Sequence, residues 1–205
     1  MIMNRKKFIM GSILTAFSIS AFGSVIKNND GLFKINEDCE TTNDILGPFY
    51  RKNAPTRSNL IHKDLKGSKV ALKGKIYGSD CGTVLKNTLI EIWHCNTDGK
   101  YDNDTDQFLH RGKQLSDENG DYKFDTILPG KYLNGKLFRP SHIHFRVTHK
   151  KTKELVSQIY FKGDPHITKD NWASDNRAEH RILPIILEDI NGNLVINFDI
   201  YLKDK

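Results

Sequence analysis

The 205-residue chain has only three cysteines, Cys39, Cys81 and Cys95, and none of them forms a Cys-x-x-C pair. The lack of such pairs excludes a zinc ribbon, whose metal is held by paired thiolates. Helical periodicity and internal repeats are also missing, which excludes helical bundles and repeat arrays. Only one apolar stretch, near the N-terminus, is long enough to concern a membrane. With 38% hydrophobic and 27% charged residues, the chain has the composition of a globular protein.

The first 23 residues carry the features of an export signal. Positive charges at residues 5–7 precede an apolar stretch, Phe8–Phe22, of 15 residues, and Ala21 and Gly23 place small side chains before a cleavage point. A membrane-spanning helix needs about 20 apolar residues, so this stretch is short. We therefore expect a cleaved signal peptide over residues 1–23 and a periplasmic or extracellular protein, with an uncleaved anchor as the alternative. After cleavage we expect no integral membrane role.

The net charge of +6 suggests a nucleic-acid-binding protein at first sight. Residues 1–23, however, contribute three positive charges and no negative one, so the remaining 182 residues carry +3. Those residues contain neither a basic stripe nor a nucleic-acid-binding motif. We therefore expect no nucleic-acid partner.

Export would allow a disulfide bond to persist. Cys81 precedes one predicted strand and Cys95 ends it, so a bridge between them on the scale of a hairpin is one interpretation. Free, buried thiols are the other, because the pairing cannot be deduced from the sequence. Cys39 is left over in either case.

The chain divides into a polar N-terminal arm or linker, residues 24–45, and a folded domain, residues 46–205. From about residue 69 onward, short segments alternate apolar and polar side chains, as half-buried strands do. Strands are expected over residues 70–77, 88–93, 142–148, 155–161 and 194–202. Two more are expected within residues 113–127, where Asn119-Gly120 favours a tight hairpin turn. Closely spaced strands with few helices predict an all-β, antiparallel sandwich or barrel whose longer loops build the site.

His142 and His144 lie two residues apart in a predicted strand, so both imidazoles project from one face. Imidazole is a ligand for Fe, Cu, Zn and Ni. Taken alone, such a pair is more often a polar strand face than half of a metal site.

The segments around these histidines resemble the intradiol ring-cleavage dioxygenases, the family of catechol 1,2-dioxygenase and protocatechuate 3,4-dioxygenase. The resemblance covers about residues 46–165, and the motifs occur in the family's order. They are LGPFY, IEIWHCNTDGKYD, FLHRG, DENGDYKFDTILPGKY, RPSHIHFRV and QIYFKGDP. The resemblance implies a prealbumin-like β-sandwich and one Fe(3+) per chain.

By position in these motifs, the implied iron ligands are Tyr101, Tyr132, His142 and His144. A tyrosine phenol, with a pKa near 10, loses its proton readily only beside a strong cation, so two phenolates suit ferric iron. In the reaction that the resemblance implies, a catechol binds through both oxygens and displaces Tyr132. Dioxygen then cleaves the ring to a cis,cis-muconate-type diacid.

Three further residues have roles implied by the same resemblance. Arg139 would stabilise negative charge on the activated ring, a role that suits a permanent cation. A structural ion pair is the alternative for Arg139. Gln158 would orient the substrate or oxygen, and Tyr50 would line the pocket.

The chain departs from the best-known members of the family in its predicted signal peptide and in lacking a long helical N-terminal segment. Its GPFYRKNAP opening looks closer to the protocatechuate dioxygenase subunits, which work with a second, related chain. The expected ligands are a small aromatic diol and O2. A homo-oligomer or a related second subunit is left open as a partner.

The main rival interpretation is a non-catalytic transthyretin-like or carboxypeptidase-regulatory-like exported binding module. Such modules share the Gly-containing strand, the DENGDYKF segment and the PGKY segment, but have no need of two strand histidines preceded by Arg-Pro. A zinc or copper hydrolase using His142 and His144 is a third interpretation.

Overall fold

The computed structural model describes residues 39–63, 65–187 and 194–205 of the chain. The predicted signal peptide, residues 1–23, and residues 24–38 of the predicted arm lie outside the described residues. Within the described part, no helix combines the length and the apolar character needed to cross a membrane.

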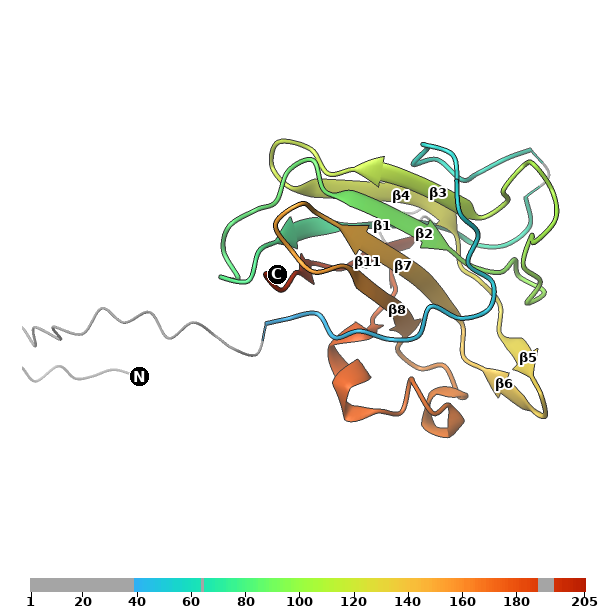
Figure 1. Cartoon of the computed structure of the whole chain (residues 1–205). Helices are drawn as coiled ribbons and strands as arrows, with labels where there is room; N and C mark the ends of the chain where they lie inside the picture. Colours follow the sequence, from blue (N-terminus) through green and yellow to red (C-terminus); the bar gives the residue numbers. More distant parts are fainter. Residues whose placement is uncertain (1–38, 64, 188–193) are drawn as a thin grey trace, which may run out of the picture. The chain divides into compact units, whose positions relative to one another are not determined.

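Two five-stranded sheets form the two layers of a sandwich (Figure 1). One sheet has the order β3-β2-β7-β8-β9, and the other has the order β10-β11-β1-β12 with β4 paired to β1. The strands are β1 (Lys69–Tyr77), β2 (Leu89–Trp93), β3 (Arg111–Leu115), β4 (Asp121–Ile127), β5 (Tyr132–Asn134), β6 (Leu137–Arg139), β7 (His142–Thr148), β8 (Leu155–Phe161), β9 (Ile182–Leu183), β10 (Ile186–Leu187), β11 (Leu194–Asn197) and β12 (Ile200–Tyr201). The β5–β6 ribbon projects from the sandwich, and two 3-10 helices, η1 (Ile167–Lys169) and η2 (Asn176–Arg181), follow β8.

Alternation along β7 lets this one strand serve both the core and the site. Ile143, Phe145 and Val147 are buried in the apolar cluster between the sheets. His142 and His144 therefore lie on the opposite face, where each is only 1% exposed. The strand predictions for residues 142–148 and 155–161 are confirmed, since β7 and β8 pair in antiparallel fashion.

The predicted sandwich is confirmed, but its sheets are mixed rather than purely antiparallel. β1 pairs in parallel with β11 and with β12, and β8 pairs in parallel with β9. Parallel neighbours need a long crossover connection, and pairing across such a distance leaves no signal in a local pattern. The predicted strand over residues 194–202 is divided at Phe198 and Asp199, where the Phe198 amide donates to the Lys73 carbonyl.

The turn at Asn119-Gly120 forms, but the predicted hairpin around it is wrong. Gly120 has a φ of 75° and donates its amide to the Asp117 carbonyl at 3.0 Å. The flanking strands belong to different sheets, because β3 pairs with β2 and β4 pairs with β1. The turn residues therefore determine that the chain reverses, but not which neighbours the two flanking strands pair with.

The disulfide bond joins Cys39 to Cys81, and Cys95 is a free, buried thiol, so the proposed Cys81–Cys95 bridge is wrong. Cys81 and Cys95 lie beyond opposite ends of β2, whose five residues span roughly 17 Å. That span exceeds the Cα separation that a disulfide can bridge. Cys95 instead donates its thiol to the Gly130 carbonyl at 3.1 Å, and burial raises its pKa to about 12.

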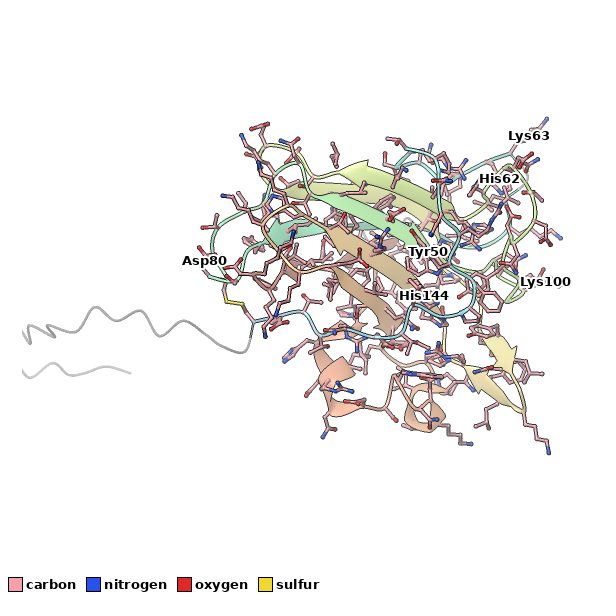
Figure 2. The ribbon with its side chains drawn as sticks, viewed as in Figure 1. Tyr50, His62, Lys63, Asp80, Lys100 and His144 are labelled. Atoms are coloured by element: carbon pink, nitrogen blue, oxygen red, sulfur yellow. A yellow bond between two sulfur atoms is a disulfide. The ribbon has the colours of Figure 1, made fainter. Side chains whose placement is uncertain are left out.

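The disulfide fastens residues 39–50 to the loop between β1 and β2 (Figure 2). This segment joins the end of the predicted arm to the LGPFY motif, and it is called the arm from here on. Beyond Cys39, separate hydrogen bonds tie the arm to the sandwich. Thr41 donates its amide to Tyr201 of β12, and Asp44 donates its amide to Val156 of β8. The arm therefore has two kinds of attachment, one of which depends on oxidation.

Replacing Cys39 and Cys81 together by Ser is expected to lower the free energy of unfolding. The bond closes a sequence separation of 42 residues, for which loop-closure entropy gives about 4 kcal/mol. Denaturant titration with and without reductant measures the loss. Reductant should lower the midpoint of the native chain and leave the double variant unchanged. An equal response of both proteins would contradict the bond.

Candidate metal centre

The structure brings all four predicted metal ligands together from three segments of the chain. The Nε2 atoms of His142 and His144 lie 3.2 Å apart, and the Tyr101 hydroxyl lies 3.3 Å from His142 Nε2. The Tyr132 ring centre lies 5.7 Å from that of Tyr101 and 5.6 Å from that of His142. Figure 2 shows His144 beside the arm. Two imidazole nitrogens and one phenol oxygen therefore lie close together, and the Tyr132 ring is adjacent to them.

Two glycines let the loops that carry the tyrosines approach each other closely. Gly99 has a φ of 76°, and a Cβ atom there would lie 2.4 Å from the Lys131 carbonyl oxygen. A Cβ atom on Gly130 would lie 2.1 Å from the Thr97 carbonyl oxygen. Because only glycine fits at both positions, the backbones before Tyr101 and Tyr132 pack directly together. The two rings then meet edge to face, at 84°.

Both histidines are neutral and have the form that a metal ligand requires. Burial lowers the pKa of His142 to about 3, with the positive charge of Arg139 adding to the effect. Burial, followed by the neighbouring His142, lowers the pKa of His144 well below its ordinary value. His142 Nδ1 lies 2.6 Å from the Pro140 carbonyl oxygen, which can only accept, so Nδ1 holds the proton. The Nε2 lone pair of His142 is therefore directed at the point of convergence.

Tyr101 differs from the histidines, because its ligand form would be charged. Its ring keeps some exposure, but burial of the hydroxyl raises its pKa well above the ordinary value, and Cys95 and Tyr132 add to the rise. Arg139 and Arg111 act in the opposite direction. Without a cation in contact, Tyr101 is a neutral phenol, and a strongly charged metal ion would be needed to hold it as a phenolate.

The arm covers the donor cluster with residues that the motif analysis did not single out. A Cβ atom on Gly47, whose φ is 73°, would lie 3.0 Å from His144 Cε1, so this backbone rests directly on the imidazole. Phe49 stacks on Tyr101 with ring centres 4.2 Å apart. His144 also stacks on Trp93, with ring centres 4.9 Å apart and an angle of 6° between the ring planes. The LGPFY motif was the signal for Gly47 and Phe49, although it does not tell which of its residues contacts a ligand.

Arg111 hydrogen-bonds both the arm and the loop that carries Tyr101. Arg111 is 1% exposed, and its guanidinium donates to the Phe49 carbonyl at 2.6 Å. It also donates to the Asp102 carbonyl through Nε at 3.0 Å and through Nη2 at 2.9 Å. Phe49 and the residue after Tyr101 are thereby fixed to one rigid donor. The FLHRG motif contains Arg111, but it does not tell which carbonyl groups the side chain contacts.

Arg139 lies directly opposite Tyr132 in the β5–β6 ribbon, so the two side chains share a face. Arg139 also forms a buried ion pair with Asp170, in which its Nε lies 2.7 Å from Oδ2. The structural ion pair that was the alternative for Arg139 is therefore present, and it coexists with a position beside Tyr132.

Gln158 and Tyr50 lie near the centre but make their hydrogen bonds elsewhere. The Gln158 amide nitrogen donates to the Ile45 carbonyl at 3.0 Å, and its oxygen lies 3.3 Å from the Tyr160 hydroxyl. The Tyr50 hydroxyl accepts from Arg146 at 3.0 Å, and its ring meets Trp93 edge-on. The substrate roles of Gln158 and Tyr50 stay predictions.

The donor set fits ferric iron. Across the described ranges, no three His, Cys, Asp or Glu side chains gather as a metal site of those residues alone would require. The convergent donors are instead two neutral imidazoles and phenol oxygens. Hard, anionic phenolates favour a hard trivalent cation over the divalent ions of the hydrolase interpretation.

Comparisons with known proteins identify the family of the chain. The family described as Dioxygenase matches residues 45–203. The chain is 28% identical over 189 residues to a chlorocatechol 1,2-dioxygenase of Rhodococcus opacus, covering 80% of this chain and 72% of that protein. It is 35% identical over 137 residues to a protocatechuate 3,4-dioxygenase beta chain of Burkholderia cepacia, covering 61% of this chain and 57% of that one.

Among solved structures, the dioxygenase domain of a dioxygenase–carbohydrate-binding fusion protein from Streptomyces sp. SirexAA-E superimposes with a TM-score of 0.70 at 25% identity. The match covers 81% of this chain and 99% of that domain. These relatives favour an enzyme over the exported binding module. Because the family match extends over more than half of the chain, the chain belongs to the dioxygenases, in their intradiol ring-cleaving family.

Proposed function

We propose that this chain cleaves the ring of a catechol-type diol with dioxygen, between the two hydroxyl-bearing carbons, to a cis,cis-muconate-type diacid. The observation that carries the proposal is the convergence of three donor atoms: His142 Nε2 lies 3.2 Å from His144 Nε2 and 3.3 Å from the Tyr101 hydroxyl. Tyr101, Tyr132, His142 and His144 would hold one ferric ion. The bound ion would act as Lewis acid and electron acceptor, activating the diol toward dioxygen.

The protein residues have distinct tasks in this proposal. His144, packed against Gly47 and Trp93, and His142, held by the Pro140 carbonyl, would remain fixed ligands. Tyr101 is held by the stacked Phe49 ring and by the neighbouring backbone bonds to Arg111. Tyr132 stands on a ribbon whose residues 133–138 are exposed, so it has the freedom to withdraw. Its phenolate oxygen would accept one proton from the incoming diol.

Arg139 supplies a fixed positive charge beside Tyr132. Its only carboxylate contact among the described ion pairs is Asp170, which engages Nε and Nη2. The remaining Nη1 group could stabilise negative charge on the bound diol, and a buried guanidinium acts strongly because little water screens it.

Export and a second subunit belong to the proposal as well. The Cys39–Cys81 bond supports an oxidising compartment, in keeping with the predicted signal peptide. The similarity to a protocatechuate dioxygenase beta chain supports a related partner subunit.

Oxygen uptake by the iron-reconstituted full chain tests the proposed function. With catechol, protocatechuate and substituted catechols as a panel, one dioxygen should be consumed per diol. Both oxygen atoms of labelled dioxygen should appear in the diacid. A ferric tyrosinate site should also give a broad visible charge-transfer band. A colourless protein that consumes no oxygen, after expression with ample iron, would exclude this function.

A further inference from the structure

A buried carboxylate, Asp170, lies behind Arg139 in the turn that follows η1. Its Oδ2 accepts from Arg139 Nε at 2.7 Å, and its Oδ1 accepts from Arg139 Nη2 at 3.3 Å. Both side chains are 3% exposed. This two-point contact fixes the plane of the guanidinium as well as its distance, as bidentate pairs do.

Asp170 is itself held rigidly. Its Oδ1 accepts the backbone amides of Trp172 at 3.0 Å and Ala173 at 2.8 Å. The turn thereby also places the Trp172 ring 4.5 Å from Arg139 Cζ. The guanidinium is bounded by a carboxylate at its edge and an aromatic face, so rotation is blocked.

A third group engages the same edge of Arg139. The Tyr160 hydroxyl accepts from Nη2 at 3.2 Å and donates to Asp44 Oδ2 at 2.9 Å. Asp170 and Tyr160 therefore occupy Nε and Nη2, which leaves Nη1 without a bond to either. Arg139 also lies directly opposite Tyr132 in the register of the ribbon.

We infer that Asp170 is a positioning residue, which holds Arg139 so that its unengaged edge faces Tyr132 and the diol that replaces it. The inference rests on the proposed function. Among the described contacts, Asp170 bonds Arg139 and the amides of its own turn but none of the predicted ligands, so we assign its effect on the reaction to Arg139. A misplacement of about 1 Å at a charge-stabilising group costs on the order of 100-fold in rate.

Replacing Asp170 by Asn tests this role, because Asn keeps the shape and removes the charge. We expect kcat to fall about 10- to 100-fold, with KM changed less than about threefold, since Arg139 acts on charge that develops during the reaction. Asp175→Asn is the matched control. Asp175 accepts the Arg177 amide at 2.8 Å at the start of η2 and does not contact Arg139, so kcat should stay at the native value.

The Arg139→Met background separates positioning from general support of the fold. If Asp170 acts through Arg139, adding Asp170→Asn to Arg139→Met lowers kcat no further. A further fall in the double variant of the same size as in the native background would overturn the inference.

A spectroscopic readout on the chelator-stripped protein is independent of turnover. The Nε–H signal of Arg139, assigned from its loss in Arg139→Lys, should exchange slowly with water and should lose that protection in Asp170→Asn. Retained protection together with native kcat refutes the role.

If Asp170→Asn does not fold, the variant Asp170→Glu tests the role instead. It keeps the charge and shifts the guanidinium, so kcat should fall about tenfold, and native kcat refutes the role. If the native chain cleaves no catechol ring, the proposed function is wrong. The exchange measurement still reports whether Asp170 orders Arg139.

Discussion

Replacing Tyr101 by Phe is expected to abolish both the visible colour and the ring cleavage of the iron-loaded chain. The substitution removes one oxygen, the one that lies 3.3 Å from His142 Nε2, and keeps the ring that stacks on Phe49. Loss of an anionic ligand leaves the ferric charge less compensated, so iron affinity falls together with the rate. We expect kcat to fall on the order of 1,000-fold or more. Iron content per chain, the visible spectrum and oxygen uptake measure the three effects.

His144→Ala should give the same losses by removing a different donor. Tyr77→Phe is the matched control for the Tyr101 substitution, because Tyr77 lies in β1 and stacks on Tyr201 instead of facing the donor cluster. Its iron content, colour and rate should be native. Full activity in Tyr101→Phe or in His144→Ala would overturn the ligand assignment.

Short-range patterns predicted most of the fold. Alternation of apolar residues located β1, β2, β7 and β8 to within about a residue at each end, because each strand buries one face in the core. The pairing of β1 with β11 and β12 was not predictable in this way, since long segments intervene. The same limit explains the disulfide bond. Cys39 meets Cys81 because the arm runs along β8, and spacing alone does not reveal that path.

The donor cluster was more predictable than the residues that support it. Tyr101, Tyr132, His142 and His144 stand in motifs whose order along the chain is characteristic of the family. Asp170 stands in a loop and Arg111 begins β3, and their partners lie 31 and 62 residues away in the sequence. A buried ion pair or a carbonyl contact needs only one suitable atom at the end of a long side chain. Such requirements leave no periodic pattern that a sequence could display.

The buried neutral histidines make the free energy of unfolding depend on pH. Besides the two predicted ligands, burial lowers the pKa of His94 to about 3 and that of His110 to about 4. His94 is fully buried, with its ring nitrogens 2.7 Å from the Cys95 carbonyl and from the Thr126 hydroxyl. When the pKa of a histidine is lower in the folded state, the unfolded chain takes up the proton at a higher pH than the folded chain does. Stability is therefore complete above about pH 6.5 and is lost as the pH falls toward the folded pKa.

The chelator-stripped protein is expected to become strongly destabilised between pH 7 and pH 5. His94, His110 and His142, whose pKa values fall to about 4 or below, each contribute a loss of about 2 kcal/mol over that interval. Their sum, about 6 kcal/mol, is comparable with the whole stability of an ordinary domain. His94→Gln cannot titrate, so its loss should be smaller by about 2 kcal/mol, whereas His180→Gln, at an exposed position, should match the native chain. Denaturant titrations at the two pH values measure these differences. An unchanged pH dependence in His94→Gln would mean that His94 is not held neutral by the fold.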